Sequence, residues 1–147
     1  MTPQQRADRV AAAMMASDKA SPWIGIDPVS VGEGRATMAL EVKEHHCNGH
    51  GICHGGITYL LADTTFAFAC NSRNQSTVAY NNQISYLAPG QLGDRLTATA
   101  TEVSLVGRSG IYDVKVTNQD AVVIAEFRGM SRAIRGQLFD ENTGETP

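Results

Sequence analysis

Asp63 is the only charged residue in a long apolar stretch of this chain. Nearly all the other residues from Ile57 to Cys70 are hydrophobic or small. A helix that is apolar on all sides is a buried helix, and an acid inside one must be paired, protonated or in use. Because the reference pKa of Asp is about 3.9, an ionised carboxylate is available at neutral pH. Asp63 is therefore a candidate catalytic group. The structural alternative is an acid that points into a subunit interface and is held by hydrogen bonds, or one that is paired with an Arg.

A glycine-rich turn from Asn48 to Gly56 leads directly into this stretch. Gly55 and Gly56 fall at the expected N-terminus of the helix. There, free backbone N–H groups and the positive end of the helix dipole can receive a developing oxyanion. One segment thus offers an electrophilic cradle and, about two turns further along, a carboxylate. This arrangement suits acyl transfer.

These residues resemble the signature of the PaaI-type thioesterases, hot-dog-fold enzymes of phenylacetate degradation. The matching stretches lie between residues 23 and 135 and are His54-Gly55-Gly56, Leu61-Ala62-Asp63, Phe66–Ser72, Tyr86–Gly90, Gly93–Ala100 and Phe127–Gly129. The resemblance implies an acyl-CoA thioesterase that hydrolyses phenylacetyl-CoA or hydroxyphenylacetyl-CoA type thioesters without a cofactor. It also implies a homodimer as the minimal active unit, within a homotetramer, with Asp63 and the His54-Gly55 turn on different subunits.

The resemblance assigns roles to single residues. The backbone N–H of Gly55 polarises the thioester carbonyl, and Asp63 activates water or attacks the carbonyl directly. Asn48 helps to bind the carbonyl or to position water, although an Asn-Gly turn alone would account for it. For His54, contact with the thioester and an orienting role in the turn both stay open. Some relatives add a hydroxyl from the next strand, but the matching position falls near Ala79, so the partner of Asp63 stays open.

Candidate substrate contacts are basic and hydroxyl residues near late turns and aromatic residues on the central helix. Basic residues near these turns often hold the nucleotide phosphates of CoA in hot-dog thioesterases, and the aromatic residues would line an acyl pocket. For each, the alternative is a solvated surface charge or ordinary core packing. The candidates are Arg108 and Ser109 in the Gly107–Gly110 turn, Arg128, Ser131 and Arg132 on the last strand, and Tyr59 and Phe66 on the helix.

Several His and Cys residues between positions 45 and 54 raise the alternative of a metal site. Zinc sites generally use paired ligands at short spacing, often from two separate segments. A second pair is missing here, and no carboxylate cluster supports one. The sequence therefore predicts no metal and no other cofactor.

Composition sets the class of protein. A chain of 147 residues with 42% hydrophobic residues can build one domain with a normal core. The net charge of −3 argues against broad nucleic-acid binding, which usually needs a basic surface. An odd number of Cys, no secretory segment and no apolar run of membrane-spanning length predict a soluble, cytoplasmic protein with reduced thiols.

The elements that position these groups follow from hydrophobic patterning. We expect an N-terminal helix within residues 1–20 and a domain over residues 21–135, with residues 136–147 forming a disordered acidic tail. One buried helix, preceded by two strands and followed by four, indicates an α+β fold with an antiparallel sheet wrapped around the helix. The resemblance names this arrangement the hot-dog fold. The expected strands are Trp23–Ile26, Arg35–Val42, Thr77–Leu87, Asp94–Val106, Ile111–Thr117 and Ala121–Ile134.

Two other functions stay open. A hot-dog hydratase or dehydratase would use a His together with an acid to abstract a proton from the acyl chain, and His54 keeps that possibility alive. A non-catalytic acyl-CoA binding module would keep Arg108 and the pocket while tolerating the loss of Asp63.

Overall fold

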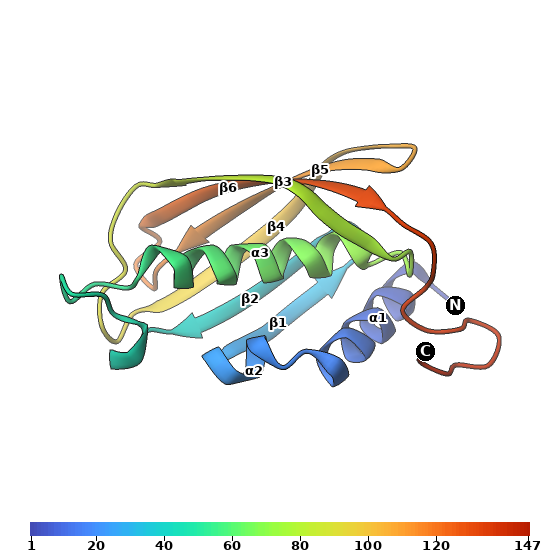
Figure 1. The fold of residues 1–147 in the computed structure, drawn as a ribbon, viewed down its shortest axis with the longest axis horizontal. Helices are drawn as coiled ribbons and strands as arrows, with labels where there is room; N and C mark the ends of the chain where they lie inside the picture. The colour runs from blue at the N-terminus through green and yellow to red at the C-terminus, as the bar shows by residue number, and fades with distance from the viewer.

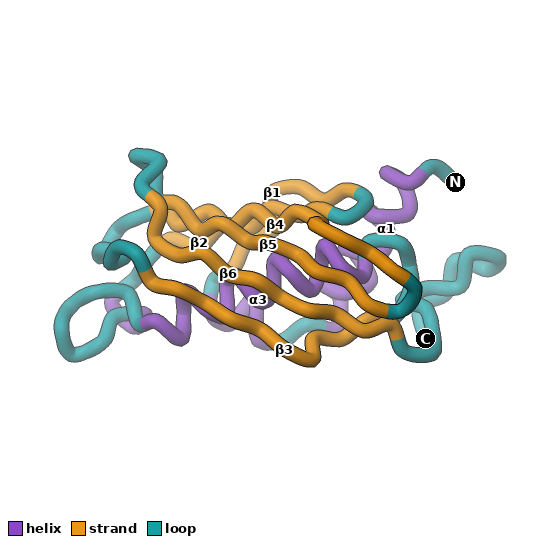
Figure 2. Tube along the Cα trace, turned by 90° about the horizontal axis from the view of Figure 1, so that it is seen from above, coloured by secondary structure: helices purple, strands orange, loops and turns teal.

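The fold is built around one long helix, α3 (Gly55–Asn71), which lies against a single curved sheet (Figure 1). The computed structural model describes all 147 residues. Its six strands form one sheet (Figure 2). They are arranged in the order β1-β2-β4-β5-β6-β3, and every neighbouring pair is antiparallel. The strands are β1 (Ile26–Gly32), β2 (Arg35–Glu41), β3 (Thr77–Tyr86), β4 (Arg95–Val106), β5 (Ser109–Thr117) and β6 (Val123–Ala133). The predicted α+β architecture is confirmed.

Burial of α3 forms the hydrophobic core. Leu61 and Phe66 from the helix are 0% and 1% exposed, and they belong to one cluster with inward-facing residues of β2, β4 and β5. Each such side chain contributes about 1.5–3 kcal/mol when it leaves water. A narrower stripe on the opposite side of α3, comprising Leu60, Asp63 and Ala67, is only half-buried. The single carboxylate therefore lies on the one face of the helix that the sheet leaves partly open.

One strand prediction was wrong. Residues 20–24 form the short helix α2 (Ala20–Ile24), and the first strand begins only at Ile26. Asp18 explains the difference, because its carboxylate accepts hydrogen bonds from both the backbone N–H and the hydroxyl of Ser21 and so nucleates a helical turn. Gly25 ends that turn in the left-handed conformation, at φ 93°.

The N-terminal helix prediction is confirmed by α1 (Pro3–Ser17). The Thr2 hydroxyl accepts a hydrogen bond from the backbone N–H of Gln5, and the Gln5 side chain accepts one from the backbone N–H of Thr2. This reciprocal pair is a capping box. None of the helices is both long enough and apolar enough to cross a membrane.

The C-terminal segment differs from the expected disordered tail, because it folds back onto α1 and the end of α3. Phe139 is 2% exposed, with the Arg9 guanidinium 4.3 Å from its ring centroid. The Asn74 side chain accepts hydrogen bonds from the backbone N–H groups of Leu138 and Phe139 and donates one to the Phe139 carbonyl. A buried aromatic ring and an amide clamp therefore outweigh the polar composition of the segment.

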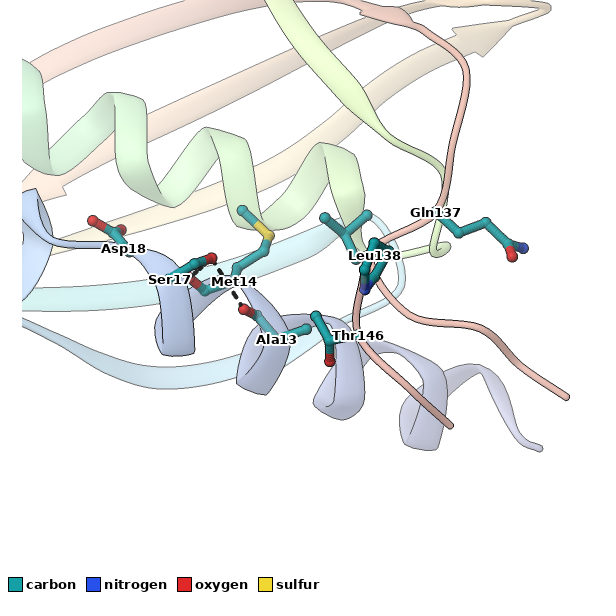
Figure 3. A pocket seen from close by; sticks show the side chains of 8 residues that line it. Ala13, Met14, Ser17, Asp18, Gln137, Leu138 and Thr146 are labelled. Carbon is teal, nitrogen blue, oxygen red and sulfur yellow. Dashed lines mark hydrogen bonds between the residues drawn. The ribbon is translucent and has the colours of Figure 1, made fainter. Parts of the chain in front are cut away.

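A shallow cavity of about 380 Å³ lies between α1 and this C-terminal segment (Figure 3). Its lining includes Met14 and Ser17 from the helix, Asp18 directly after it and Leu138 from the segment. Figure 1 places the chain's C-terminus beside α1, away from the N-terminus of α3. The cavity is thus a by-product of the fold-back and lies apart from the glycine-rich turn.

Replacing Phe139 with Ala is expected to lower the free energy of unfolding by about 3–5 kcal/mol, because a large buried ring leaves a cavity. Urea unfolding followed by circular dichroism measures this loss. Trp23→Ala removes an aromatic ring that is 81% exposed and serves as the control. Equal stability of Phe139→Ala and wild type would mean that the segment is not packed as described.

Candidate active site

His54 caps the N-terminus of α3 and leaves one backbone donor free. Its Nδ1 accepts a hydrogen bond of 2.8 Å from the backbone N–H of Gly56, and its carbonyl accepts from the N–H groups of Ile57 and Thr58. The N–H of Gly55, the first helical residue, makes no hydrogen bond within the chain. A free N–H at the positive end of a long helix is a ready-made donor for a carbonyl oxygen that gains negative charge.

A cavity of about 440 Å³ opens beside Gly55. Tyr86 forms part of its wall, and the Tyr86 hydroxyl donates a hydrogen bond of 2.9 Å to the Gly55 carbonyl. A Cβ atom at position 55 would lie 3.1 Å from the Tyr86 ring, so a larger residue there would push against that ring. The rest of the lining is mainly apolar and includes Ile52, Leu87 and Ile124.

Asn48 both builds the turn and faces the cavity. Its Oδ1 accepts hydrogen bonds from the backbone N–H groups of His50, at 3.0 Å, and Ile52, at 3.4 Å. Its Nδ2 has no partner within the chain, and the residue lines the cavity beside Gly55. The two interpretations that the sequence left open are therefore compatible, because the oxygen holds the turn while the nitrogen stays free to donate.

Asp63 is half-buried and is held by an amide that sequence reasoning did not identify. Asn82 Nδ2 on β3 donates a hydrogen bond of 3.0 Å to Asp63 Oδ1. Burial raises the pKa of the Asp63 carboxyl, and the hydrogen bond from Asn82 acts in the opposite direction. None of the ion pairs in the structure involves Asp63.

A β-bulge explains why the partner of Asp63 was missed. The pairing of β3 with β6 shifts between Ala79 and Asn81, so alternation along β3 changes face at this point. Beyond the bulge, Asn82 turns towards α3. Ala79 is exposed, and the nearby hydroxyl of Thr77 donates to the Gln75 carbonyl rather than reaching Asp63. No sequence pattern marks the bulge.

The Gly55 N–H and the Asp63 carboxylate lie far apart along α3. Gly55 and Asp63 are eight positions apart, which corresponds to about 12 Å of helix at 1.5 Å per residue. One thioester carbonyl cannot contact both groups within a single chain.

Of the aromatic candidates for the pocket, Tyr59 reaches polar surroundings and Phe66 does not. The Tyr59 hydroxyl accepts a hydrogen bond of 3.0 Å from Asn82 Nδ2, which places it beside Asp63. Phe66 is 1% exposed and packs between Tyr112 and Phe127. A Cβ at Gly129 would lie 2.7 Å from the Phe66 ring. The Phe66 ring therefore fills the core and does not line the cavity beside Gly55, and its contact with an acyl group stays a prediction.

The hydroxyl and basic residues predicted to bind substrate lie in different surroundings. Ser131 is 1% exposed, so its hydroxyl does not reach the surface of this chain, and substrate binding by Ser131 stays a prediction. Arg128 makes a bidentate ion pair with Asp113, at 2.7 and 2.9 Å. Arg108 is exposed, as is its neighbour Ser109, and it donates two hydrogen bonds to the Ala133 carbonyl. The Arg132 guanidinium lies over the ring of Tyr80.

Arg108 lies at the end of the sheet opposite to the Gly55 cavity. Ala133, its hydrogen-bond partner, pairs with Thr77, and the Thr77 carbonyl accepts from the Asn71 side chain at the C-terminal end of α3. Within one chain the structure therefore does not bring Arg108 and Gly55 together.

The His and Cys residues of the turn do not gather around a common point. No group of three or more His, Cys, Asp or Glu side chains lies close enough to hold a metal ion. Both ring nitrogens of His46 are engaged by backbone groups, with Lys43 N–H on Nδ1 and the Ile24 carbonyl at Nε2. His46 therefore anchors the loop to α2.

Comparisons with known proteins show what the chain is similar to in sequence and fold. The family model of the thioesterase superfamily matches residues 50–125. The chain is 42% identical over 129 residues to the acyl-coenzyme A thioesterase PaaI of Escherichia coli, which covers 88% of this chain and 92% of that protein. The solved structure of the E. coli PaaI protein from the phenylacetic acid degradation operon matches with a TM-score of 0.91 at 40% identity, over 92% of this chain and 99% of that one. A structure from Streptococcus mutans bound to acetyl CoA has a TM-score of 0.74 at 27% identity, over 77% and 91% of the two chains. The hot-dog fold is thereby confirmed.

His54→Ala is expected to destabilise the protein by about 0.5–2 kcal/mol, because the N–H of Gly56 loses its cap. His54→Asn supplies another side chain favoured at this position and should recover most of the loss. Urea unfolding of both variants measures the difference. Equal destabilisation in the two variants would show that capping is not what His54 contributes.

Proposed function

The chain belongs to the thioesterase superfamily, and we propose that it hydrolyses phenylacetyl-CoA type aryl-acyl thioesters to the free acid and CoA. One observation carries the proposal: a free backbone N–H at the start of α3 and a half-buried carboxylate on the same helix. The E. coli relative is an acyl-CoA thioesterase from a phenylacetic acid degradation operon. This origin supports an aryl-acetyl substrate.

The chemistry follows from these two groups. The thioester oxygen accepts a hydrogen bond from the Gly55 N–H, with Asn48 Nδ2 as a second donor. As the carbonyl carbon becomes tetrahedral, negative charge grows on this oxygen, and losing one such donor typically costs about 2.7–4 kcal/mol. Asp63 either removes a proton from the attacking water or attacks the carbonyl carbon itself. Collapse of the tetrahedral species expels the CoA thiolate. Attack by water then gives the free acid at once, whereas attack by Asp63 leaves an acyl-aspartyl anhydride that a water molecule hydrolyses to the free acid. These steps use only groups of the polypeptide and water.

We propose that each site combines Gly55 of one subunit with Asp63 of another. The separation of about 12 Å along one helix supports this division, because the two groups must act on one carbonyl. The position of β3 supports this division too. It is an edge strand that pairs only with β6, so its other edge is free to meet a second subunit, and Asn82 on this strand binds Asp63. A homodimer is then the smallest active unit. A homotetramer and a cytoplasmic location stay predictions.

Substrate binding divides in the same way. The cavity beside Gly55 has about 440 Å³ and mainly apolar walls, which suits an aryl group. Arg108, with Ser109 beside it, is proposed to meet the CoA phosphates of a site completed by a neighbouring subunit. Arg128, already paired with Asp113, is a poorer phosphate ligand because its charge is neutralised.

Of the two alternatives, the hydratase is disfavoured by a specific contact. Its proton abstraction needs a His that works with an acid, but His54 Nδ1 is engaged by the Gly56 N–H, and its side chain makes no bond with Asp63. A non-catalytic acyl-CoA module would bind thioesters without releasing CoA. Measuring both binding and CoA release with Asp63→Asn separates that module from an enzyme.

Asp63→Ala is expected to lower thioester hydrolysis by roughly 10²–10⁴-fold, since its carboxylate supplies the general base or nucleophile. CoA release is measured with phenylacetyl, hydroxyphenylacetyl, benzoyl, short linear and long linear thioesters. Wild type should prefer the aryl-acetyl esters. Asp120→Ala, which removes an exposed acid in the β5–β6 turn, should match wild type. An active, folded Asp63→Ala variant would make Asp63 structural.

Two inactive variants are expected to complement each other. Gly55→Val crowds Tyr86 and blocks the donor, whereas Asp63→Ala removes the acid. A mixed dimer of the two keeps one intact site, so random mixing should restore about a quarter of wild-type activity. Co-expression with two affinity tags and a CoA-release assay tests this. Purified mixed dimers without activity would place both groups of a site in one chain.

A further inference from the structure

The amide of Asn82 joins two polar groups of α3. Its Nδ2 donates to Asp63 Oδ1 and to the Tyr59 hydroxyl, at 3.0 Å in each case. Both hydrogens of the amide nitrogen are thus committed. Asp63 Oδ2 makes no hydrogen bond within the chain. The amide holds one carboxylate oxygen and leaves the other available.

The other end of the same amide is unusual. Asn82 Oδ1 is buried and has no hydrogen-bond partner, and it is the only buried side-chain nitrogen or oxygen in the structure that lacks one. Buried polar atoms are normally paired, so such an exception calls for an explanation. Turning the amide over would place Oδ1 against an oxygen of Asp63, and two acceptors would then face each other. The observed orientation is the one that an ionised Asp63 requires.

No charged group competes with Asn82 for control of this carboxylate. The pKa of Asp63 is raised by burial and lowered by the Asn82 hydrogen bond, with no contribution from a charged side chain. The titratable groups nearby are Tyr59 and Cys70 on α3 itself, and burial raises the pKa of the Cys70 thiol to about 12. From β6, the contact in this region is the Phe127 ring against Tyr59. Asn82 is therefore the one polar group on the sheet that acts on Asp63.

We propose that Asn82 is a positioning residue for Asp63. Its amide fixes one oxygen of the Asp63 carboxylate and so directs the other oxygen at the reacting water or carbonyl. This inference rests on the proposed function. The bulge between Ala79 and Asn81 is what brings the amide to α3, and such bulges commonly re-aim a side chain beside an active site. Because a hydrogen bond donated to a carboxylate favours its charged form, the same contact keeps Asp63 ionised at lower pH.

The test compares pH profiles of kcat/KM for CoA release from phenylacetyl-CoA. Asp63 must be ionised to act, so the acid limb reports its pKa in the free enzyme. Asn82→Leu removes the donor, raises that pKa and moves the acid limb to higher pH. A limb that moves up by one pH unit lowers kcat/KM about tenfold at every pH below it. KM should change little. Asn82→Asp is nearly isosteric and should move the limb further, because two adjacent carboxylates resist ionising together.

Asn81→Ala is the matched control, because it removes a neighbouring amide that is exposed and makes no side-chain hydrogen bond. Its acid limb should coincide with that of wild type. An acid limb that stays in place in Asn82→Leu overturns the inference, even if stability or the plateau rate falls, since a merely structural residue would give that result. If Asn82→Leu fails to fold, Asn82→Ala, which also removes the donor without adding a charge, decides the question.

A second readout does not depend on turnover. The ¹³C NMR titration of the Asp63 carboxyl, assigned with Asp63→Asn, should move to higher pH in the Asn82 variants. If wild type releases no CoA from any thioester but this titration moves, the proposed function fails while the control of Asp63 by Asn82 stands. If wild type is active and the titration does not move, the inference fails while the proposed function stands.

Discussion

The burial of α3 against the sheet is the interaction on which the rest of the structure depends. Leu61 and Phe66 leave water completely, and the sheet curves around the helix to cover them. That burial fixes the direction of the helix, its free N-terminal N–H and the side on which Asp63 emerges. It also creates an unfavourable environment for a charge. The site can be understood as the set of contacts that make one carboxylate tolerable there.

Contacts in two regions of the helix prepare the chemistry, and one of them also stabilises the carboxylate. At the helix N-terminus, His54 satisfies the Gly56 N–H and Tyr86 holds the Gly55 carbonyl, so only the Gly55 N–H stays free. In the middle of the helix, Asn82 binds Asp63 and Tyr59. We propose that the length of helix between the two regions divides the chemistry between subunits, so that activity requires a dimer.

The sequence was informative where local rules decide the outcome. An apolar stretch with one acid, a Gly-Gly helix start and a Thr-Pro cap all act locally, so α3, α1 and the candidates Asp63 and Gly55 could be predicted. The errors lie where distant contacts decide. The bulge in β3 that presents Asn82 depends on pairing with β6, and Phe139 becomes buried only because α1 and Asn74 meet it. Neither Ser131 nor Phe66 carries a local sign of its burial.

The most direct test of the central claim is a crystal structure of the Asp63→Asn variant with phenylacetyl-CoA bound. We predict that the thioester carbonyl oxygen lies about 2.7–3.1 Å from the Gly55 nitrogen of one subunit. We also predict that the carbonyl carbon lies beside position 63 of the other subunit. A thioester whose carbonyl lies away from every Gly55 N–H, or whose two contacts come from a single chain, would contradict the claim.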